Sequence, residues 1–351
     1  MKKQLVLIIV FLFIIYACRK DKAEPAPYIA TPYQLTIPPR FPQPYLSPEN
    51  PLTVEGIKLG RKLYYDPILS SNGLSCSSCH IREKSFSSPL FTTVTGEKIS
   101  VPPHVNLAWN PDYNWNGSEP KLDRLCLGDF GPNFFNTNMD SLVKRLKRHS
   151  AYPSLFKQAF NIDDVAGLSH DALQLKIVYA ISQFLRTMIS SNSKFDKMVR
   201  HELMFTPDEY NGYEIYSTER GDCFHCHDYP LLTSNAFKNN GLDSSLATVN
   251  MGRYLVTGNS SDIGKFSAPT LRNIELTAPY MHDGRFQTLE EVVEFYDSGV
   301  HFGSPNIDPL MTKPAKQYGL HLTPLEKINL VKFLKTLTDS TFINNPDFMA
   351  N

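Results

Sequence analysis

The stretch GDCFHCHDYP, residues 221–230, places two cysteines and two histidines close together. Within it, Cys223, Cys226 and His227 form a C-x-x-C-H motif, and residues 76–80 (CSSCH) form a second copy. Paired cysteines of this kind occur in zinc sites, in redox-active dithiols and at sites of covalent haem attachment. Haem attachment is the explanation that accounts for a histidine directly after both pairs. The two thiols bond to the porphyrin, and the adjacent histidine then reaches the iron.

The sequence therefore predicts two covalently bound haem c groups. A chain with 6 cysteines is not expected to contain this motif twice by chance. We expect His225, inside the second motif, to be a polar loop residue and Cys126 to be a small buried apolar side chain. The predicted attachment cysteines are Cys76, Cys79, Cys223 and Cys226, and the predicted iron ligands are His80 and His227.

The segments that lead to the two motifs resemble each other. GRKLYYDPILSSNGLSCSSCH (60–80) and GYEIYSTERGDCFHCH (212–227) each run glycine, two residues, an aliphatic residue, tyrosine, a loop and the motif. This similarity indicates an internal duplication, with a helix before each motif. Thr206, Pro207 and Glu209 form the start signal of the second of these helices.

The rest of the chain predicts a mainly α-helical fold. In residues 170–189, Leu173, Ile177, Ile181, Phe184 and Met188 recur at helical spacing and predict a core helix. Residues 322–337 predict a closing helix that starts at Thr323. Signals for strands are scarce, so we expect two cytochrome c-like haem domains with long irregular loops.

The N-terminus has the pattern of an export signal. Lys2 and Lys3 precede an apolar run over residues 5–17, shorter than the roughly 20 residues of a spanning helix. We expect a signal peptide at 1–17 and a lipidated, proline-rich tether at 18–50 that begins at Cys18. The alternative is secretion without use of Cys18. Either form would work outside the cytoplasm, and we expect a periplasmic lipoprotein anchored to a membrane.

From about residue 50 to 340 the chain resembles the bacterial dihaem cytochrome c peroxidases, the group that includes the MauG-type enzymes. The resemblance rests on both C-x-x-C-H motifs, NLAWNPDYNWNG (106–117), ISQFLRTMISSNSKFD (181–196) and GKFSAPTLRNIELTAPYMHDGRFQTLEEVV (264–293). It implies an N-terminal haem domain at 51–200 that contains the peroxide site and the connecting helix. It also implies a C-terminal haem domain at 201–351 for electron transfer.

The resemblance also implies roles for four residues around the haems. Leu289, Val292 and Tyr296 fall on one helical face, and by this pattern alone Tyr296 would be a core residue. In the MauG-type enzymes a tyrosine here ligates the second haem in place of methionine, and a phenolate favours oxidised iron. Trp115 would lie between the haems as a relay, or would merely pack. His282 and Arg285 would support the second haem, or would form a loop ion pair.

The acid–base group of the peroxide site departs from the family pattern. Asn138 aligns with the usual glutamate, and asparagine cannot act as a base. Glu119 and Asp140 are nearby substitutes. His104 is a candidate sixth ligand for the first haem, or else a buried hydrogen-bonded histidine.

The family often carries a calcium ion between its domains, which makes calcium a further candidate cofactor. Its asparagine ligand aligns with Ser100, and carbonyl donors would remain at Thr277 and Pro279. The balance of 35 basic and 35 acidic residues gives no indication of a nucleic-acid partner.

Two functions follow from this reading. The first is an oxidoreductase that reduces hydrogen peroxide at the N-terminal haem with equivalents passed through the C-terminal haem, extending to MauG-like oxidation of a substrate. Its electrons would come from a small cytochrome or another donor. The second is a dihaem electron-transfer or sensing protein whose peroxidase site has lapsed. A homodimer is a candidate assembly for either.

Overall fold

The computed structural model describes Tyr28 and residues 30–89, 91–92, 98–245, 248–314, 316 and 319–350. Contacts divide the chain into Met1–Ala30 and Thr31–Asn351, and the fold described below is that of the second unit. The predicted signal peptide and Cys18 lie outside the described residues. In the described part of the chain, no helix has the length and apolar character needed to cross a bilayer.

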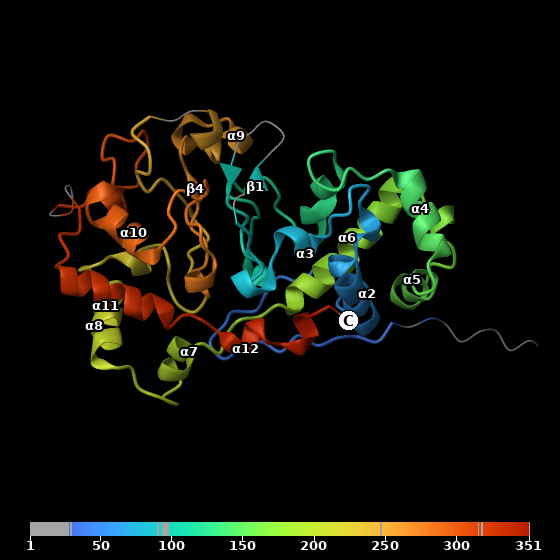
Figure 1. Cartoon of the computed structure of the whole chain (residues 1–351), viewed down its shortest axis with the longest axis horizontal. Helices are drawn as coiled ribbons and strands as arrows, with labels where there is room; N and C mark the ends of the chain where they lie inside the picture. Colours follow the sequence, from blue (N-terminus) through green and yellow to red (C-terminus); the bar gives the residue numbers. More distant parts are fainter. Residues whose placement is uncertain are drawn as a thin grey trace, which may run out of the picture. The chain divides into compact units, whose positions relative to one another are not determined.

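Helices dominate the described residues, as the sequence predicts (Figure 1). The β-strands in the described residues are very short and form two small antiparallel sheets, β1 with β2 and β3 with β4. The helices are α2 (Val54–Tyr65), α3 (Cys76–Cys79), α4 (Met139–Arg148), α5 (Tyr152–Phe160), α6 (His170–Thr187), α7 (Lys194–Val199), α8 (Pro207–Ser217), α9 (Tyr254–Thr257), α10 (Leu289–Glu294), α11 (Pro324–Lys335) and α12 (Ser340–Ile343). The strands are β1 (Phe91–Thr92), β2 (Lys98–Ile99), β3 (Phe237–Lys238) and β4 (Phe266–Ser267).

Each helix that leads to a C-x-x-C-H motif crosses a partner helix at a glycine. Helix α2 packs on α6 and α8 packs on α11 (Figure 1). A Cβ at Gly60 would lie 1.9 Å from the carbonyl oxygen of Ala180, and one at Gly212 would lie 2.0 Å from that of Asn329. Such distances are far below van der Waals contact, so only glycine permits these crossings. The two glycines occupy equivalent positions in the predicted duplication, and each allows the helix before its motif to approach the backbone of a partner helix.

Apolar side chains form two main cores, whose limits differ from the predicted domain boundary at residue 200. The first core runs from Leu59 to Met188, and the second begins at Phe195 of α7. Phe342 and Phe348, near the end of the chain, return to the first core rather than the second. The C-terminal segment therefore belongs to both modules, because these two rings find apolar cover only against the N-terminal helices.

Residues 31–50 of the predicted tether pack on the body, which corrects the predicted limits of the tether. Phe41 is buried edge-on against Trp109, with ring centroids 5.2 Å apart. The indole Nε1 of Trp109 donates to the carbonyl of Pro42 at 2.7 Å. The stretch contains no helix, as its prolines require. Its aromatic side chains nevertheless anchor the stretch to the body, because their burial removes a large apolar surface from water.

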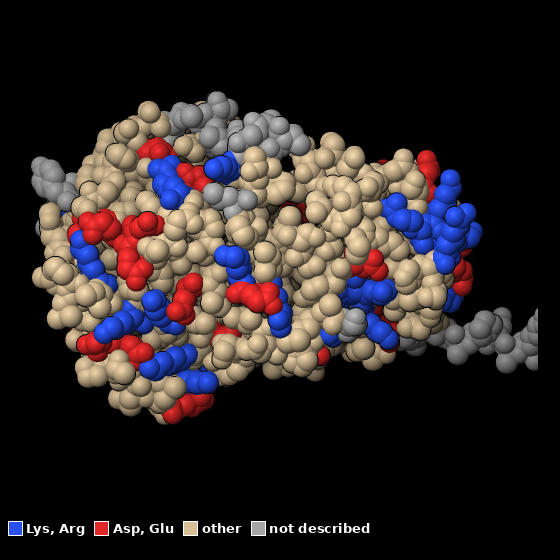
Figure 2. Space-filling view, viewed as in Figure 1, with Lys and Arg blue, Asp and Glu red and all other residues tan. Residues whose placement is uncertain are grey.

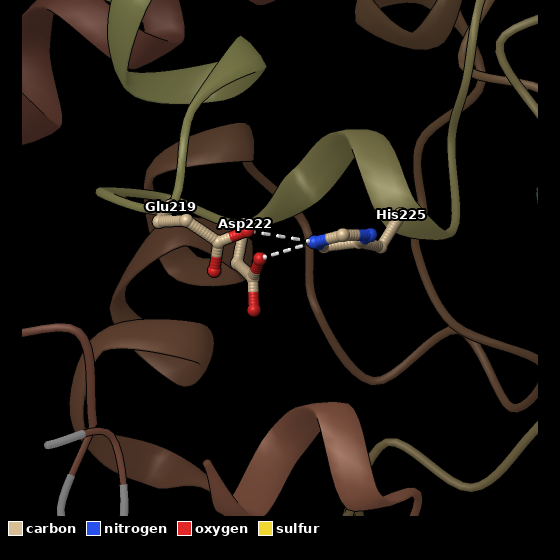
Figure 3. Close-up of side chains that lie close together, drawn as sticks. All are labelled: Glu219, Asp222 and His225. Atoms are coloured by element: carbon tan, nitrogen blue, oxygen red, sulfur yellow. Dashed lines mark hydrogen bonds and ion pairs between the residues drawn. The ribbon is translucent and has the colours of Figure 1, made fainter. Parts of the chain in front are cut away.

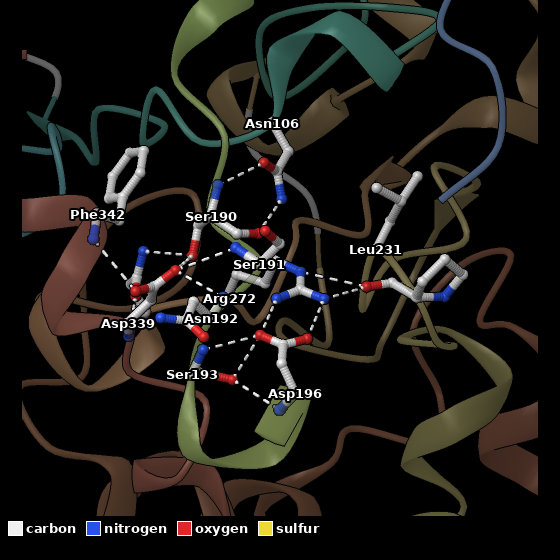
Figure 4. A network of polar contacts seen from close by, with 12 residues as sticks. Asn106, Ser190, Ser191, Asn192, Ser193, Asp196, Leu231, Arg272, Asp339 and Phe342 are labelled. Atoms are coloured by element: carbon white, nitrogen blue, oxygen red, sulfur yellow. Dashed lines mark hydrogen bonds and ion pairs between the residues drawn. The ribbon is translucent and has the colours of Figure 1, made fainter. Parts of the chain in front are cut away.

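Polar contacts hold the segment between the two cores in one conformation (Figure 4). A carboxylate oxygen of Asp339 accepts from the backbone N–H of Ser191 at 3.0 Å. Arg272 is 0% exposed and forms two bonds with Asp196, at 2.8 and 3.0 Å. Burial alone would raise the pKa of Asp196, but the Arg272 guanidinium lowers it below its usual value. The paired charges thus fix the connector that joins α6 to α7.

Charged side chains of both signs are interspersed over the face shown in Figure 2. This distribution agrees with the equal numbers of basic and acidic residues in the chain.

Candidate haem sites

Two cavities each contain one C-x-x-C-H motif. The N-terminal cavity has a volume of about 500 Å³ and the C-terminal cavity one of about 250 Å³. Each of the five described cysteines is a free thiol. The motif residues on the N-terminal cavity are Cys76, Cys79 and His80, and those on the C-terminal cavity are Cys223, Cys226 and His227.

The two motif histidines are held in the same way. The Nδ1 atom of His80 lies 2.9 Å from the carbonyl oxygen of Phe86, and that of His227 lies 3.0 Å from the carbonyl oxygen of Pro269. Burial lowers the pKa of both histidines to about 4, so the rings are neutral near pH 7. A neutral ring that donates from Nδ1 keeps its lone pair on Nε2, which is the arrangement of a metal-ligating histidine.

The thiols do not favour the zinc or dithiol alternatives. Burial raises the pKa of Cys223 to about 12, and it also raises the pKa of Cys76, Cys79 and Cys226. Dithiol exchange uses thiolates, which such burial disfavours. Zinc needs about four ligands close together, and among the described residues neither motif brings three ligating side chains within reach of one ion. Thioether bonds to a porphyrin remove the ionisable thiol altogether. Together with the two histidines, these residues fit one covalently attached haem in each cavity.

Tyr296 lies on the C-terminal cavity, together with Leu289 and Val292, as their spacing predicts. It belongs to a π-helical turn, Phe295–Gly299, which directly follows α10 and which the sequence analysis did not predict. Burial raises the pKa of Tyr296 to about 12, while a hydrogen bond from Asn240 at 3.2 Å opposes this shift. A phenolate here would therefore require a cation at bonding distance, which a haem iron would provide.

Met281 also lies on the C-terminal cavity, and the sequence analysis missed it. The amide Nδ2 of Asn240 reaches both its sulfur, at 3.7 Å, and the hydroxyl of Tyr296. The backbone of Met281 has a φ of 70°, which is unusual for a side chain of this size. The sequence signal that could have identified Met281 is its position directly before His282, which the resemblance already associated with the second haem. Met281 thus offers a thioether sulfur as a candidate ligand that competes with Tyr296 in the same cavity.

Trp115, Phe266 and His282 line both cavities, and we call these three residues the shared wall. The indole Nε1 of Trp115 donates to the carbonyl of Ser100 at 2.6 Å, and the Ser100 N–H donates to the carbonyl of His282 at 2.9 Å. The His282 ring stacks on Phe266, with centroids 3.7 Å apart. Burial lowers the pKa of His282 to about 4. Hydrogen bonds through Ser100 thus link Trp115 to His282, and a ring stack links His282 to Phe266.

Arg285 lies on neither cavity. Its guanidinium pairs with Asp243 at 3.0 Å and with Asp283 at 2.5 Å, and it donates to the carbonyl of Leu242 at 3.0 Å. Burial alone would lower the pKa of Arg285, but these two carboxylates raise it. The arginine thus forms the loop ion pair that the sequence left open as the alternative.

The structure does not bring the predicted acid–base candidates into the N-terminal cavity, which corrects that expectation. A carboxylate oxygen of Glu119 accepts from the backbone N–H of Lys121 at 3.0 Å. Asn138 is exposed and caps the start of α4 with its side-chain oxygen. Asp140 is exposed and lies 3.3 Å from His170. Glu119 and Asn138 thus accept from backbone N–H groups of a turn and a helix start, because those N–H groups need acceptors, while Asp140 pairs with a histidine.

His104 lies beside His80 rather than across an iron from it. The two rings stack with centroids 3.5 Å apart and an interplanar angle of 17°. Two imidazoles on opposite faces of one iron would be farther apart, since each metal–nitrogen bond alone spans about 2 Å. The Nδ1 atom of His104 lies 3.2 Å from the hydroxyl of Tyr64, in a buried position. The structure thus supports the alternative of a buried hydrogen-bonded histidine.

The residues around Thr277 do not fit the candidate calcium ion. The Ser100 hydroxyl donates to the carbonyl of Pro279 at 3.2 Å. The ammonium of Lys84 donates to the intervening carbonyl of Ala278 at 3.2 Å, which places a positive charge among the predicted donors. A divalent cation would be repelled there.

Glu219, Asp222 and His225 form the one group of three candidate metal ligands that the described residues contain (Figure 3). The Nε2 atom of His225 lies 3.0 Å from each carboxylate. The ammonium of Lys313 lies 2.9 Å from both Glu219 and Asp222 and already supplies a cation. His225 is therefore a polar loop residue, as predicted, and points to these carboxylates.

Two cavities with C-x-x-C-H motifs and a shared aromatic wall define a dihaem c-type cytochrome. The family profile for "Di-haem cytochrome c peroxidase" matches residues 54–203. The methylamine utilization protein MauG of Methylorubrum extorquens is 30% identical over 308 residues, which cover 85% of this chain and 83% of that protein. The cytochrome c551 peroxidase of Nitrosomonas europaea is 32% identical over 313 residues, covering 86% and 84% respectively. This chain belongs to the dihaem cytochrome c peroxidase family, and it is an oxidoreductase with two c-type haems.

Solved structures agree with this assignment. A MauG-like protein associated with microbial copper homeostasis superposes with a TM-score of 0.77 at 33% identity, covering 90% of this chain and 99% of that one. The dihaem peroxidase BthA of Burkholderia thailandensis superposes with a TM-score of 0.71 at 19% identity, covering 87% and 93%. The predicted mainly helical fold and the predicted family are both confirmed.

Proposed function

We propose that this protein reduces hydrogen peroxide in the N-terminal cavity with electrons that enter through the C-terminal cavity. The observation that carries the proposal is the shared wall, because Trp115 lines both cavities and offers one oxidisable ring between them. The reaction takes one peroxide, two electrons and two protons to two waters. Two molecules of a reduced one-electron donor, such as a small cytochrome, supply the electrons.

The chain's own residues would hold and orient the cofactors for this reaction. Bound haem supplies an iron that accepts an oxygen of peroxide and that takes up and releases electrons. Cys76 and Cys79 would attach the first haem, and His80 would ligate it through Nε2. The carbonyl of Phe86 fixes the orientation of the His80 ring through Nδ1. Cys223, Cys226 and His227 would hold the second haem, with Pro269 in the place of Phe86.

Tyr296 is the proposed second ligand of the C-terminal haem. A phenolate donates charge and favours oxidised iron, so this side of the protein would store an oxidising equivalent rather than a ready electron. The similarity to MauG supports an extension of the activity to the oxidation of a substrate other than a small cytochrome.

The proposed location is the periplasm, with the body tethered to a membrane by lipid at Cys18. The export pattern at residues 1–17 supports this location. The tether would comprise the residues that precede Thr31, since residues 31–50 pack on the body.

The purified protein with both haems is expected to oxidise a reduced small cytochrome when hydrogen peroxide is added. Two molecules of reduced cytochrome are oxidised for each molecule of peroxide, because peroxide accepts two electrons. Absorbance of the cytochrome measures the rate, and peroxide with cytochrome alone is the control. If the protein exchanges electrons rapidly with a small redox mediator but does not react with peroxide over minutes, the electron-transfer alternative replaces the enzyme.

A second prediction concerns the ligand opposite His227. Tyr296→Phe is expected to change the ferric spectrum of one haem only, because the phenyl ring cannot coordinate iron. Tyr296→Met is expected to raise the reduction potential of that haem, since a thioether favours reduced iron. Met281→Leu is the matched control and should leave that spectrum unchanged. The reverse result, with a change in the leucine variant alone, would assign Met281 as the ligand and return Tyr296 to packing.

A further inference from the structure

Asp129 is a carboxyl group on the N-terminal cavity to which no role has been given. It lies near the end of the 3₁₀ helix Leu122–Phe130 and is half-buried among Cys126, Phe134 and Phe135 on the cavity surface. The backbone N–H of Phe135 donates to the backbone carbonyl of Asp129 at 2.9 Å, which fixes the backbone at this position. The segment around it diverges from the family pattern, so the sequence alone gave no reason to select this residue.

The carboxyl lies close to the haem-attachment thiols. Its negative charge raises the pKa of Cys76 and Cys79, although burial is the larger cause for both. The causes that set the pKa of His80 are instead burial and the Phe86 carbonyl. Asp129 therefore lies near the place where the porphyrin would attach, on a different segment from the one that supplies His80.

The surroundings of Asp129 keep its carboxyl able to gain and lose a proton near neutrality. Burial raises the pKa of Asp129 to about 7, and a hydrogen bond with the Cys126 thiol opposes this shift. Asp129 in turn acts on the thiols of Cys76 and Cys79, which would become thioethers once haem is attached. Lys98 is the one Lys or Arg among the described lining residues, and it is exposed.

We propose that Asp129 is the acid–base group of the peroxide site, in the role of the family glutamate with which Asn138 aligns. This inference rests on the proposed peroxidase function. The Asp129 carboxylate takes the proton from one peroxide oxygen and returns it to the other as the O–O bond breaks. That second oxygen leaves as water, and the carboxylate is regenerated. The remaining oxygen becomes a second water with two electrons from the donor and two protons from solvent.

Asp112 is the other carboxyl on this cavity, and it is the direct competitor. Its charge acts on Tyr113, whereas that of Asp129 acts on the haem-attachment thiols. A general acid–base group must reach the reacting oxygens, and these would lie over the porphyrin. The proximity of Asp129 to Cys76 and Cys79 therefore favours it over Asp112.

The test compares Asp129→Asn, Asp112→Asn and Glu119→Gln as proteins that carry both haems. The first readout is the rate at which cyanide binds to the ferric protein as a function of pH, followed by absorbance. Hydrogen cyanide must give up its proton to bind, so a nearby base accelerates the reaction. The native protein is expected to show a midpoint near the Asp129 pKa of about 7. Asp129→Asn should lose this midpoint and bind more slowly, while the other two variants should keep it.

The second readout is peroxide turnover. Asp129→Asn is expected to lower kcat by about 10²- to 10⁴-fold with little change in KM, the usual effect of removing one acid–base group. If native turnover occurs while Asp129→Asn keeps both its rate and its cyanide midpoint, Asp129 is not the group. A loss confined to Asp112→Asn would overturn the proposal in favour of Asp112. If the native protein shows the cyanide midpoint but no turnover, the peroxidase function fails while the assignment of the proton-accepting group stands.

Haem content and circular dichroism establish that each variant is folded. Should Asp129→Asn carry fewer than two haems, Asp129→Glu decides, because it keeps a carboxyl and shifts its position. That variant must retain a cyanide midpoint at an altered pH and a measurable turnover. An unaltered midpoint and rate in Asp129→Glu would contradict the assignment.

Discussion

Cys79→Ala is expected to lower the haem content of the protein from two covalently bound groups to about one. Cys79 and Cys76 both lie on the N-terminal cavity. The loss of the Cys79 thiol would remove one of the two covalent bonds to the porphyrin. Cys226→Ala should remove about one haem from the C-terminal cavity for the same reason. The pyridine haemochrome spectrum after acid-acetone extraction measures the covalent content, and the intact mass of the chain gives the number of groups.

Cys126→Ala is the matched control for both substitutions. Cys126 is buried in the N-terminal core but belongs to neither C-x-x-C-H motif, so this variant should keep two haems. A colourless, zinc-containing protein from cells with intact haem maturation would contradict the assignment of both cavities. The same conclusion would follow if Cys79→Ala and Cys226→Ala each retained two extraction-resistant haems.

Trp115→Phe is expected to slow electron transfer between the two haems about tenfold or more, which corresponds to a barrier higher by about 1.4 kcal/mol. Phenylalanine keeps an aromatic ring in the shared wall, but it is much harder to oxidise than indole. Oxidation by peroxide should then remain on the His80 side of the protein. Stopped-flow spectra of the two haems after mixing with peroxide measure this directly, because the proposed ligation of one haem by Tyr296 would make the two spectra distinguishable.

Trp109→Phe is a close control, since the chain has 2 tryptophans. Trp109 also donates its indole N–H to a backbone carbonyl, that of Pro42, but it lies on neither cavity. Its substitution should leave communication between the haems intact. Equal rates of transfer in the native protein and in Trp115→Phe would assign Trp115 to packing and would remove the observation that supports the proposed function.

Local sequence signals predicted the parts of this protein that depend on neighbouring residues. Thr206 and Thr323 each cap a helix at the predicted start, because the donor and acceptor lie three residues apart. The C-x-x-C-H motifs predicted both cavities for a similar reason. Four consecutive peptide bonds hold the cysteines and histidine close together, whatever the rest of the fold does. The apolar periodicity of 170–189 likewise predicted α6 as a buried helix.

Contacts between distant segments decided what the sequence analysis missed or misplaced. The prolines of residues 31–50 forbid a helix, but only the presence of Trp109 nearby shows that Phe41 is buried. Phe342 and Phe348 join the N-terminal core from the other end of the chain, against the predicted domain limits. No local pattern distinguishes a buried aromatic residue from a solvent-exposed one when its cover comes from far away in the sequence.

The candidate acid–base residues show most clearly the difference between what local sequence predicts and what distant contacts decide. Alignment to a family pattern pointed to position 138, and Glu119 was a nearby substitute; the fold uses Asn138 for a helix cap and Glu119 for a turn. Asp129 lies in a segment with no recognisable pattern, yet the fold places it on the N-terminal cavity near Cys76 and Cys79. The sequence by itself thus determined the haem-binding motifs, the helices and the family. The tertiary structure alone decided that Asp129 and Asp112, and not Glu119, line the N-terminal cavity, because the environment and proton affinity of a side chain depend on the segments packed around it.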